Sequence, residues 1–200
     1  MSLVQQLIDQ GQITDPNSAK GRLLVAAARL FKNKGYERTT VRDLAAEIGI
    51  QSGSLFHHYK SKEAILQAVM EETIVLNTAL MQDALALTDN PRDKVLALVR
   101  CELQSILGET GEAMSVLVYE WRSLKAESQK HILTLRDAYE QIWLDTLEEA
   151  RNAGMVQIDA FILRRFLTGA LSWTTNWYKP DGEMTLEQLA EYALSLAVKS

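Results

Sequence analysis

Residues 39–63 read TTVRDLAAEIGIQSGSLFHHYKSKE, and this stretch is the most informative about the fold. Val41, Leu44 and Ile48 are spaced i, i+3 and i+7, which places them on one face of a helix. Gly49 follows directly and permits a tight turn before a second, shorter helical segment. The stretch therefore predicts two short helices that meet at a glycine turn.

Side chains able to cap helices stand at the predicted helix starts. Thr40 followed three residues later by Asp43 has the pattern of a capping box. Ser52 can cap the short helix that follows the glycine turn, and Ser61 can cap a longer helix that begins at Lys62. These signals agree with the helix boundaries that the apolar spacing predicts.

A further helix is predicted ahead of this stretch. Leu23, Ala27 and Phe31 lie on one face of a segment that begins near Ser18, and Gly35 fits the position just after a helix end. Three short helices with a glycine turn between the second and third are typical of a helix-turn-helix motif. The helix after the turn, which is the third of these three, commonly lies in the major groove of DNA.

The third helix offers a polar outer surface. Leu55 and Tyr59 lie four residues apart and are expected to face the core. Ser54, His57 and His58 would then point away from it. Small and hydrogen-bonding side chains on the outside of a short helix can reach base edges or phosphates.

The net charge of −5 conceals an uneven distribution. Residues 18–62 hold nine Lys or Arg and three acidic residues, or +6, whereas the remainder carries −11. A compact basic segment favours a local polyanion site. The acidic remainder argues against an architectural or non-specific DNA binder, the less favoured alternative, since such proteins spread positive charge widely.

The segment from Phe31 to Leu66 resembles the TetR family of bacterial repressors. The residues that carry the resemblance are Phe31, Gly35–Tyr36, Thr39–Val41, Asp43–Ala45, Gly49–Ile50, Gly53–Tyr59 and Lys60–Glu63. The resemblance implies an all-α protein with an N-terminal three-helix DNA-binding domain and a larger helical ligand-binding and dimerisation domain. We expect residues 1–17 to form a tail, 18–64 the DNA-binding domain and 65–200 the second domain. The function it implies is that of a transcriptional repressor. Repression is preferred to activation because members of this family commonly repress.

The resemblance also implies roles for single residues. The DNA-contacting set is Thr40, Arg42, Gln51, Ser52, Gly53, Ser54, His57, His58 and Lys62. Within it, Thr40 and Lys62 match phosphate-contacting positions, and His58 matches a backbone contact. The positions that approach bases are matched by Ser52, Gly53, Ser54 and His57. Two positions depart from the family pattern. Phe56 replaces a tyrosine whose hydroxyl binds phosphate, and Gln51 replaces a capping serine.

The remainder of the chain is predicted to be helical, with helices over 91–107, 112–122, 126–153, 159–177 and 185–197. The helix over 159–177 is apolar nearly all round and must be buried on every side. One side would cover the core and the other a second copy of the chain. A two-fold homodimer places its two reading helices about 34–36 Å apart on an inverted repeat.

A regulator needs an input, and we expect a pocket for a small apolar or amphipathic effector. Its candidate lining is Met114, Trp121, Arg122, Tyr139, Trp143, Phe166, Trp173, Asn176 and Trp177. Residues 173–182 resemble the branch of the family that senses acyl-CoA thioesters. A regulator of drug efflux or of another metabolic pathway, with a different apolar ligand, is the alternative.

Other features exclude several function classes. We find no G-x-S-x-G, Walker, G-x-G-x-x-G or H-E-x-x-H motif, so an enzyme is disfavoured. The adjacent His57 and His58 diverge by about 100° on a helix and make a poor metal site; we expect no metal and no cofactor. The single Cys101, the lack of a signal peptide and the lack of a long apolar run favour the cytoplasm and no membrane.

The first 17 residues fit none of these roles. They contain two Asp and no Lys or Arg, so they cannot serve as a basic minor-groove arm. Leu3 to Ile8 can form one apolar helical turn, but Gly11 and Pro16 prevent the helix from continuing. We expect a frayed or loosely docked tail.

Overall fold

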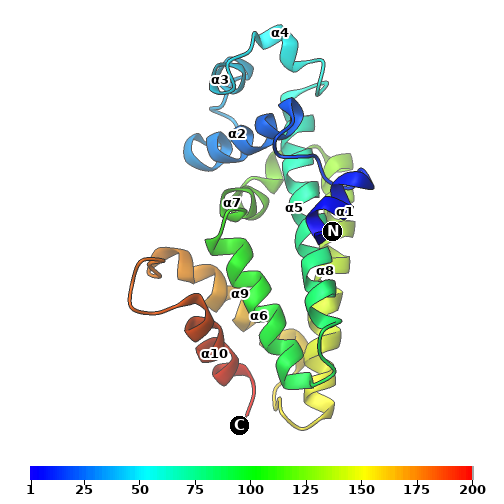
Figure 1. Ribbon diagram of the computed structural model, residues 1–200, viewed down its shortest axis with the longest axis vertical. Coiled ribbons are helices and arrows are strands. Elements are labelled where there is room, and N and C mark those ends of the chain that lie inside the picture. Colours follow the sequence, from blue (N-terminus) through cyan, green and yellow to red (C-terminus); the bar gives the residue numbers. More distant parts are fainter. Residues whose placement is uncertain (200) are drawn as a thin grey trace. The chain divides into compact units, whose positions relative to one another are not determined.

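The computed structural model describes residues 1–199, and these are all-helical, as predicted (Figure 1). No strand occurs among them. The α-helices are α1 (Leu3–Asp9), α2 (Ala19–Lys34), α3 (Val41–Glu47), α4 (Ser52–Leu55), α5 (Lys62–Leu85), α6 (Pro91–Leu107), α7 (Gly111–Tyr119), α8 (Ala126–Asn152), α9 (Ala160–Trp173) and α10 (Leu186–Ala197). Two short 3₁₀ segments are η1 (Trp121–Ser123) and η2 (Thr174–Asn176).

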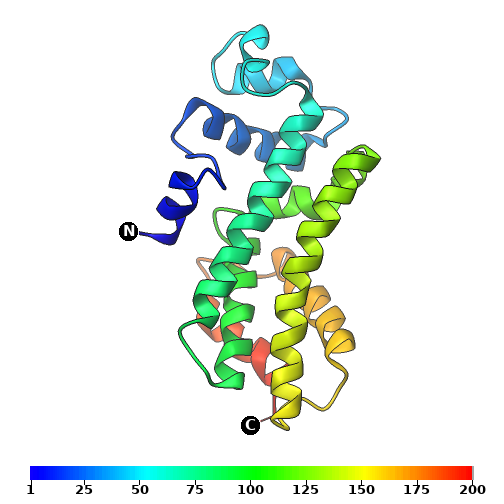
Figure 2. The same cartoon turned by 90° about the vertical axis from the view of Figure 1, so that its right-hand side faces the viewer.

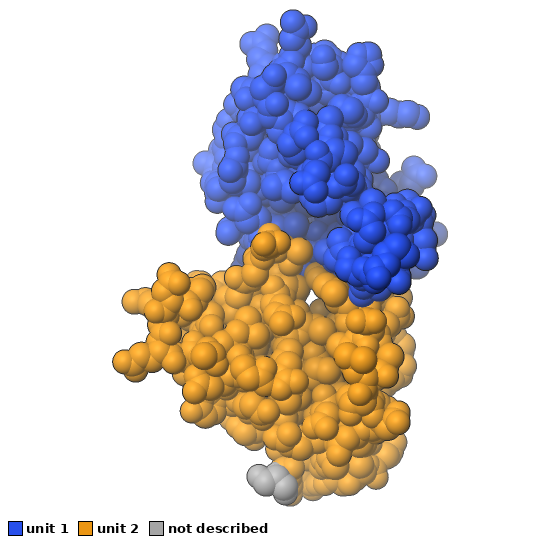
Figure 3. Space-filling view, in the orientation of Figure 1, with its two compact units in different colours: residues 1–76, 111–136 blue, residues 77–110, 137–200 orange. Residues whose placement is uncertain are grey.

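The chain forms two compact units (Figure 3). The first comprises residues 1–76 and 111–136, and the second comprises 77–110 and 137–200. The first unit is therefore larger than the segment 18–64 expected for DNA binding. It takes in α7, which packs on α2, and the first part of α8. Sequence periodicity does not reveal such contacts, because they join segments some 80 residues apart.

Capping explains where most helices begin. The hydroxyl of Ser18 accepts a hydrogen bond from the Gly21 amide at the start of α2. Thr40 and Asp43 form the expected capping box at α3, with both reciprocal bonds present. The turn after α3 uses Gly49, whose φ of +72° is a conformation that other residues rarely adopt. The helix-turn-helix geometry is thus a direct product of local sequence.

The N-terminal segment is better ordered than the sequence suggested. Residues 3–9 form α1, and the side chains of Leu7 and Ile13 are buried. The Thr14 amide and hydroxyl both donate to the Glu72 carboxylate, at 2.8 and 2.7 Å. Of the two expected states, frayed or loosely docked, the structure shows a docked segment, whose partner Glu72 lies 58 residues further along the chain.

A close backbone approach also ties this segment down. A Cβ added to Gly21 would lie 2.0 Å from the Asp15 carbonyl oxygen, so only glycine fits at this point of α2. Figure 2 shows α1 and the connection to α2 from the side. Residues 1–17 are therefore an integral part of the first unit.

The second unit is a bundle in which α10 packs on α6 and α9, and α9 packs on α6. Its core includes Trp143 of α8, which is fully buried. The side chains of Leu98, Leu163 and Leu194 contribute one apolar residue each from α6, α9 and α10. Helix α9 thus buries one side in this core, as the sequence predicted.

Helix α5 is long and apolar enough, by length and composition alone, to cross a membrane. The sequence analysis did not expect such a segment. However, Leu66, Val69 and Met70 of this helix are buried inside the protein, and a core helix of a globular protein meets the same criterion. A single helix of this kind is weak support for a membrane span.

Candidate nucleic-acid interface

The short helix α4 and the turn after it form the predicted reading surface. Gln51 occupies the N-cap position in an extended conformation, and its side chain makes no capping hydrogen bond. Ser52 is the first helical residue, so the prediction that Ser52 caps this helix was wrong. The helix also ends at Leu55 and does not continue to Tyr59. The cap fails because Gln51, and not the serine after it, has the extended backbone that a cap requires.

The burial of side chains along this segment matches the predicted faces. Leu55 and Tyr59 are buried, and the ammonium group of Lys20 lies 5.2 Å from the centre of the Tyr59 ring. Gly53, His57 and His58 are exposed. The inner residues anchor α4 to the unit and leave its polar side open to solvent.

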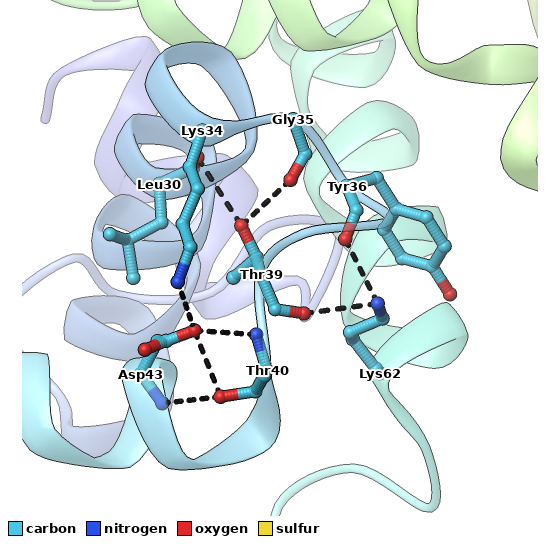
Figure 4. A network of polar contacts seen from close by, with 8 residues as sticks. All are labelled: Leu30, Lys34, Gly35, Tyr36, Thr39, Thr40, Asp43 and Lys62. Atoms are coloured by element: carbon cyan, nitrogen blue, oxygen red, sulfur yellow. Dashed lines mark hydrogen bonds and ion pairs between the residues drawn. The ribbon is translucent and has the colours of Figure 1, made fainter.

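Lys62 has a role within the protein that the sequence did not reveal. Its ammonium group donates to the backbone carbonyl oxygens of Tyr36 and Thr39, at 2.9 and 3.0 Å (Figure 4). It also lies 4.0 Å from the centre of the Tyr36 ring. Lys62 therefore fixes the turn that leads into α3, in addition to any contact it makes with DNA.

The start of α3 is held by a charged network. One Asp43 carboxylate oxygen accepts hydrogen bonds from the Lys34 ammonium at 2.6 Å and from the Thr40 amide at 2.7 Å (Figure 4). The bond from Lys34, followed by those from Thr40, lowers the pKa of Asp43 to about 2. The exposed Thr40 is thereby oriented, and the exposed Arg42 follows it on the first turn.

We expect Lys62→Ala to have two effects. Loss of the bonds to Tyr36 and Thr39 should lower the free energy of unfolding by about 1 kcal/mol. Loss of a phosphate contact should weaken DNA binding and reduce the slope of log affinity against log salt by about one unit. Chemical denaturation and a salt series of mobility shifts measure the two effects separately.

The exposed Lys60 provides the matched control. Lys60→Ala removes the same charge two residues away and should leave stability unchanged. If Lys62→Ala lowers stability but leaves the salt slope at the wild-type value, Lys62 supports the turn and does not contact a phosphate.

The next residue, Glu63, connects α5 to the beginning of α8. Its carboxylate accepts hydrogen bonds from the Lys125 amide at 2.8 Å and from the Ser128 hydroxyl at 3.4 Å, and it pairs with the Lys125 ammonium at 3.1 Å. Burial acts to raise the pKa of Glu63, but the bonds from Lys125 outweigh it and lower the pKa. A carboxylate at the N-terminus of α8 is also favoured by the helix dipole.

The nine residues predicted to line a pocket are divided between the two units. Met114, Trp121 and Arg122 belong to the first unit. The exposed Arg122 follows Trp121, whose ring centre lies 6.0 Å from the guanidinium carbon of Arg136. These three residues come from α7 and η1, which the sequence analysis assigned to the sensing domain.

The other six belong to the second unit and fall into two groups. Trp143 is buried and Tyr139 is partly buried in the core. In contrast, Phe166, Trp173, Asn176 and Trp177 are exposed in the single chain. The second group fits a surface that a further protein covers better than the lining of an enclosed pocket.

A buried charge cluster in the second unit was missed by the sequence analysis. The guanidinium group of Arg164 pairs with Glu102 at 3.0 Å and with Glu140 at 3.0 Å, and lies over the Trp143 ring at 4.3 Å. The Tyr139 hydroxyl donates to Glu102 at 3.1 Å. The available signal was Glu102 itself, a charged residue in the otherwise apolar stripe of α6.

Burial and pairing act in opposite directions on Arg164. Burial acts to lower its pKa, but the charges of Glu102 and Glu140 outweigh it and raise the pKa above the ordinary value. Arg164 is therefore charged in the core. Within residues 1–199, no three His, Cys, Asp or Glu side chains are gathered as metal ligands would be.

Comparisons with known proteins agree with this geometry. Residues 23–69 match the family described as bacterial regulatory proteins, tetR family, and residues 88–200 match the family of Tetracyclin repressor-like C-terminal domains. The chain belongs to the TetR family. This member of the family is thus a DNA-binding transcriptional regulator with an N-terminal helix-turn-helix, as predicted.

Several relatives match nearly the whole chain. The HTH-type transcriptional repressor KstR2 of Mycobacterium tuberculosis is 28% identical, over 91% of this chain and 92% of its own length. A structure described as that of KstR2, the ketosteroid transcriptional regulator of the same organism, is 26% identical with a TM-score of 0.82 and covers 94% of this chain and 100% of that one.

A structure described as that of superantigen pfit is 61% identical, with a TM-score of 0.87 over 98% of both chains. AibR in complex with isovaleryl coenzyme A and operator DNA has a TM-score of 0.81 at 24% identity, covering 90% of this chain and 98% of AibR, which shows the shared fold.

Proposed function

We propose that this TetR-family regulator is a repressor that binds an inverted-repeat operator as a homodimer and is released by a small apolar or amphipathic molecule. The observation that carries the proposal is the α4 surface, which is anchored by Leu55 and Tyr59, leaves His57 and His58 exposed and leaves Ser52 and Ser54 half-buried. Similarity to the repressor KstR2 over nine-tenths of the chain supports repression of transcription and not activation.

The contacts to the operator follow from this surface. We assign base contacts to the α4 segment, at Ser52, Gly53, Ser54 and His57. The remaining members of the predicted set, which we assign to the backbone or the edge of the site, are Thr40, Arg42, Gln51, His58 and Lys62. Changing Ser54 should alter which sequences bind, whereas a uniform loss of affinity on all DNA would contradict a base-reading role.

The dimer contact is assigned to the outer side of α9. Ile162, Phe166 and Trp173 are exposed and lie on one stripe of this helix, and the small residues Gly169 and Ala170 lie between them. Small residues permit a partner helix to approach closely. A contiguous exposed apolar surface of this kind marks a protein contact.

Helix α10 extends this surface. Its exposed residues Tyr192 and Leu196 are four positions apart and therefore share one face. Two helices from each protomer would form a four-helix contact around a two-fold axis. The symmetry of the dimer then explains why its operator should be an inverted repeat.

The effector class that we favour is an acyl-CoA thioester. The resemblance of residues 173–182 to the thioester-sensing branch of the family supports it, as does the AibR complex with isovaleryl coenzyme A. Cations are needed near a CoA ligand, and one candidate is Arg165, which is half exposed and lies 3.6 Å from Glu140 at the edge of the cluster around Arg164. A different apolar ligand, such as a drug, remains the alternative.

Release requires that the effector favour a form in which the reading helices no longer match the operator. We assign the coupling between effector binding and the DNA-reading helices to the first turn of α5. There Lys62 holds the turn before α3, while the adjacent Glu63 holds the start of α8. A displacement of α8 would therefore shift Glu63 and the adjacent Lys62, and with Lys62 the turn that precedes α3.

Selection from random duplex DNA tests the operator, followed by mobility shifts on DNA flanking the gene. We expect enrichment of an inverted repeat whose two halves are bound together. Enrichment of no sequence would contradict a specific regulator.

The effector is tested on the protein–operator complex by fluorescence anisotropy of labelled DNA. Acyl-CoAs of increasing chain length should lower the anisotropy, whereas coenzyme A and the matching free acids should leave it unchanged. Release by the free acids, or by none of the thioesters, would contradict the thioester proposal without affecting DNA binding.

A second candidate function follows from the 61% identity to superantigen pfit. We infer that the purified protein also stimulates T cells. The test is T-cell proliferation with endotoxin-free protein, with heat-unfolded protein as the control. A response no greater than that control would contradict this activity and leave the regulator proposal intact.

A further inference from the structure

Phe56 is an apolar side chain on a surface that is otherwise polar. It directly follows α4, and its side chain is 51% exposed. Between residues 40 and 62 it is the only large apolar residue that is exposed. The exposed residues nearest to it in the sequence are Gly53, His57 and His58. An isolated exposed phenyl ring within a DNA-reading surface is explained if it packs on an apolar group of the DNA.

The backbone places this ring beside the base-reading residues. Phe56 is still in the right-handed helical region, with φ −71° and ψ −10°. Its side chain therefore continues the spiral of α4 and is displaced by about 100° from the buried Leu55. Ser54 precedes it by two residues and His57 follows it directly, and both are assigned base contacts.

The chemistry of the ring limits what it can recognise. A phenyl group has neither a conventional hydrogen-bond donor nor a conventional acceptor, so it can bind neither a phosphate oxygen nor a polar base edge. The apolar group that distinguishes one base from the others in the major groove is the C5-methyl of thymine. Packing of the ring on this methyl would remove both apolar groups from water.

We propose that Phe56 reads a thymine in each half of the operator by packing on its C5-methyl group. The proposal rests on the proposed function, in which α4 enters the major groove. It makes Phe56 a specificity-determining residue of an otherwise polar reading surface.

The experiment uses the inverted repeat that the full-length protein selects from random duplexes. Each thymine is replaced in turn by deoxyuridine, in both halves together, which removes only the methyl group. We expect one position at which wild-type affinity falls about fourfold for each methyl removed. Phe56→Ala should bind the thymine and uracil operators equally at that position. Phe56→Tyr keeps the ring and should keep the difference.

Two controls address folding and specificity. Tyr119→Ala removes another exposed aromatic side chain from the same unit and should leave the thymine preference unchanged. Circular dichroism reports whether Phe56→Ala is folded; if it is not, Phe56→Gln keeps the side-chain length and should equally abolish the preference.

Each other outcome overturns the proposal. If Phe56→Ala weakens binding to the same extent on thymine and uracil DNA at every position, the ring contacts sugar and does not read a base. If Phe56→Ala binds as tightly as wild type, the ring makes no contact. A protein that selects no sequence at all would overturn the proposed function as well, whereas selection without a thymine–uracil difference overturns only the role of Phe56.

Discussion

Replacing Arg164 by methionine should lower the free energy of unfolding by about 3–5 kcal/mol, the effect of breaking a buried ion pair. The Arg164 side chain is only 2% exposed and pairs with Glu102 and Glu140 at 3.0 Å. Methionine keeps much of the apolar volume, so the loss comes mainly from the Glu102 carboxylate left unpaired in the core. Urea denaturation followed by circular dichroism measures it, at one fixed protein concentration because the stability of the proposed dimer depends on concentration.

The neighbouring arginine provides the matched control. Arg165 is half exposed and lies 3.6 Å from the same Glu140. Because solvent screens such a pair, Arg165→Met should change the stability by less than about 1 kcal/mol. Equal losses for the two variants would show that burial of the charge is not the cause.

A double variant separates the unpaired charge from the loss of packing. Arg164→Met combined with Glu102→Gln leaves no unpaired charge at this point in the core. We expect it to be more stable than Arg164→Met alone, because the cost of burying the charge is removed. A double variant that is no more stable would assign the loss to packing against Trp143.

Phe166→Glu should convert the dimer into monomers and lower operator affinity by at least about 100-fold. Phe166 is 68% exposed in the single chain, in the middle of the apolar stripe of α9. In a two-fold contact the substitution introduces two like charges into an apolar surface, which disfavours association. Affinity falls because a monomer binds one half-site and loses the gain from binding two linked sites.

Analytical ultracentrifugation and mobility shifts measure the two effects. Leu87→Glu is the control, since Leu87 is 83% exposed in the same unit but lies in the connection between α5 and α6. It should remain dimeric and bind normally. A Phe166→Glu protein that stays dimeric would place the contact elsewhere, and residues 166 and 173 would then return to the predicted effector pocket.

The helical architecture was predictable because helix formation depends on residues three or four positions apart. The capping box of Thr40 and Asp43 and the buried face of Leu55 and Tyr59 both appear as expected. Each is a property of a single turn or helix. The error at Ser52 is of the same local kind, a shift of one residue in a helix start.

The candidate site was predictable only in part. The outer side of the α4 segment follows from the spacing of its apolar residues: His57 and His58 are exposed, whereas Ser54 is half-buried. The pocket residues were chosen by composition, and composition does not distinguish an aromatic side chain in a core, such as Trp143, from one on an outer face, such as Trp173. That difference depends on which side of a helix another segment covers.

The helix-turn-helix, the capping box of Thr40 and Asp43 and the exposed His57 and His58 thus follow from local sequence, because these features arise within a few residues of each other. The tertiary structure alone decided that Lys62 fixes the turn at Tyr36, that Thr14 is bound by Glu72, and that Arg164 meets Glu102. The partners in these pairs are 26, 58 and 62 residues apart. No local periodicity connects residues at such separations, and only the packing of helices brings these hydrogen-bonding and charged groups together.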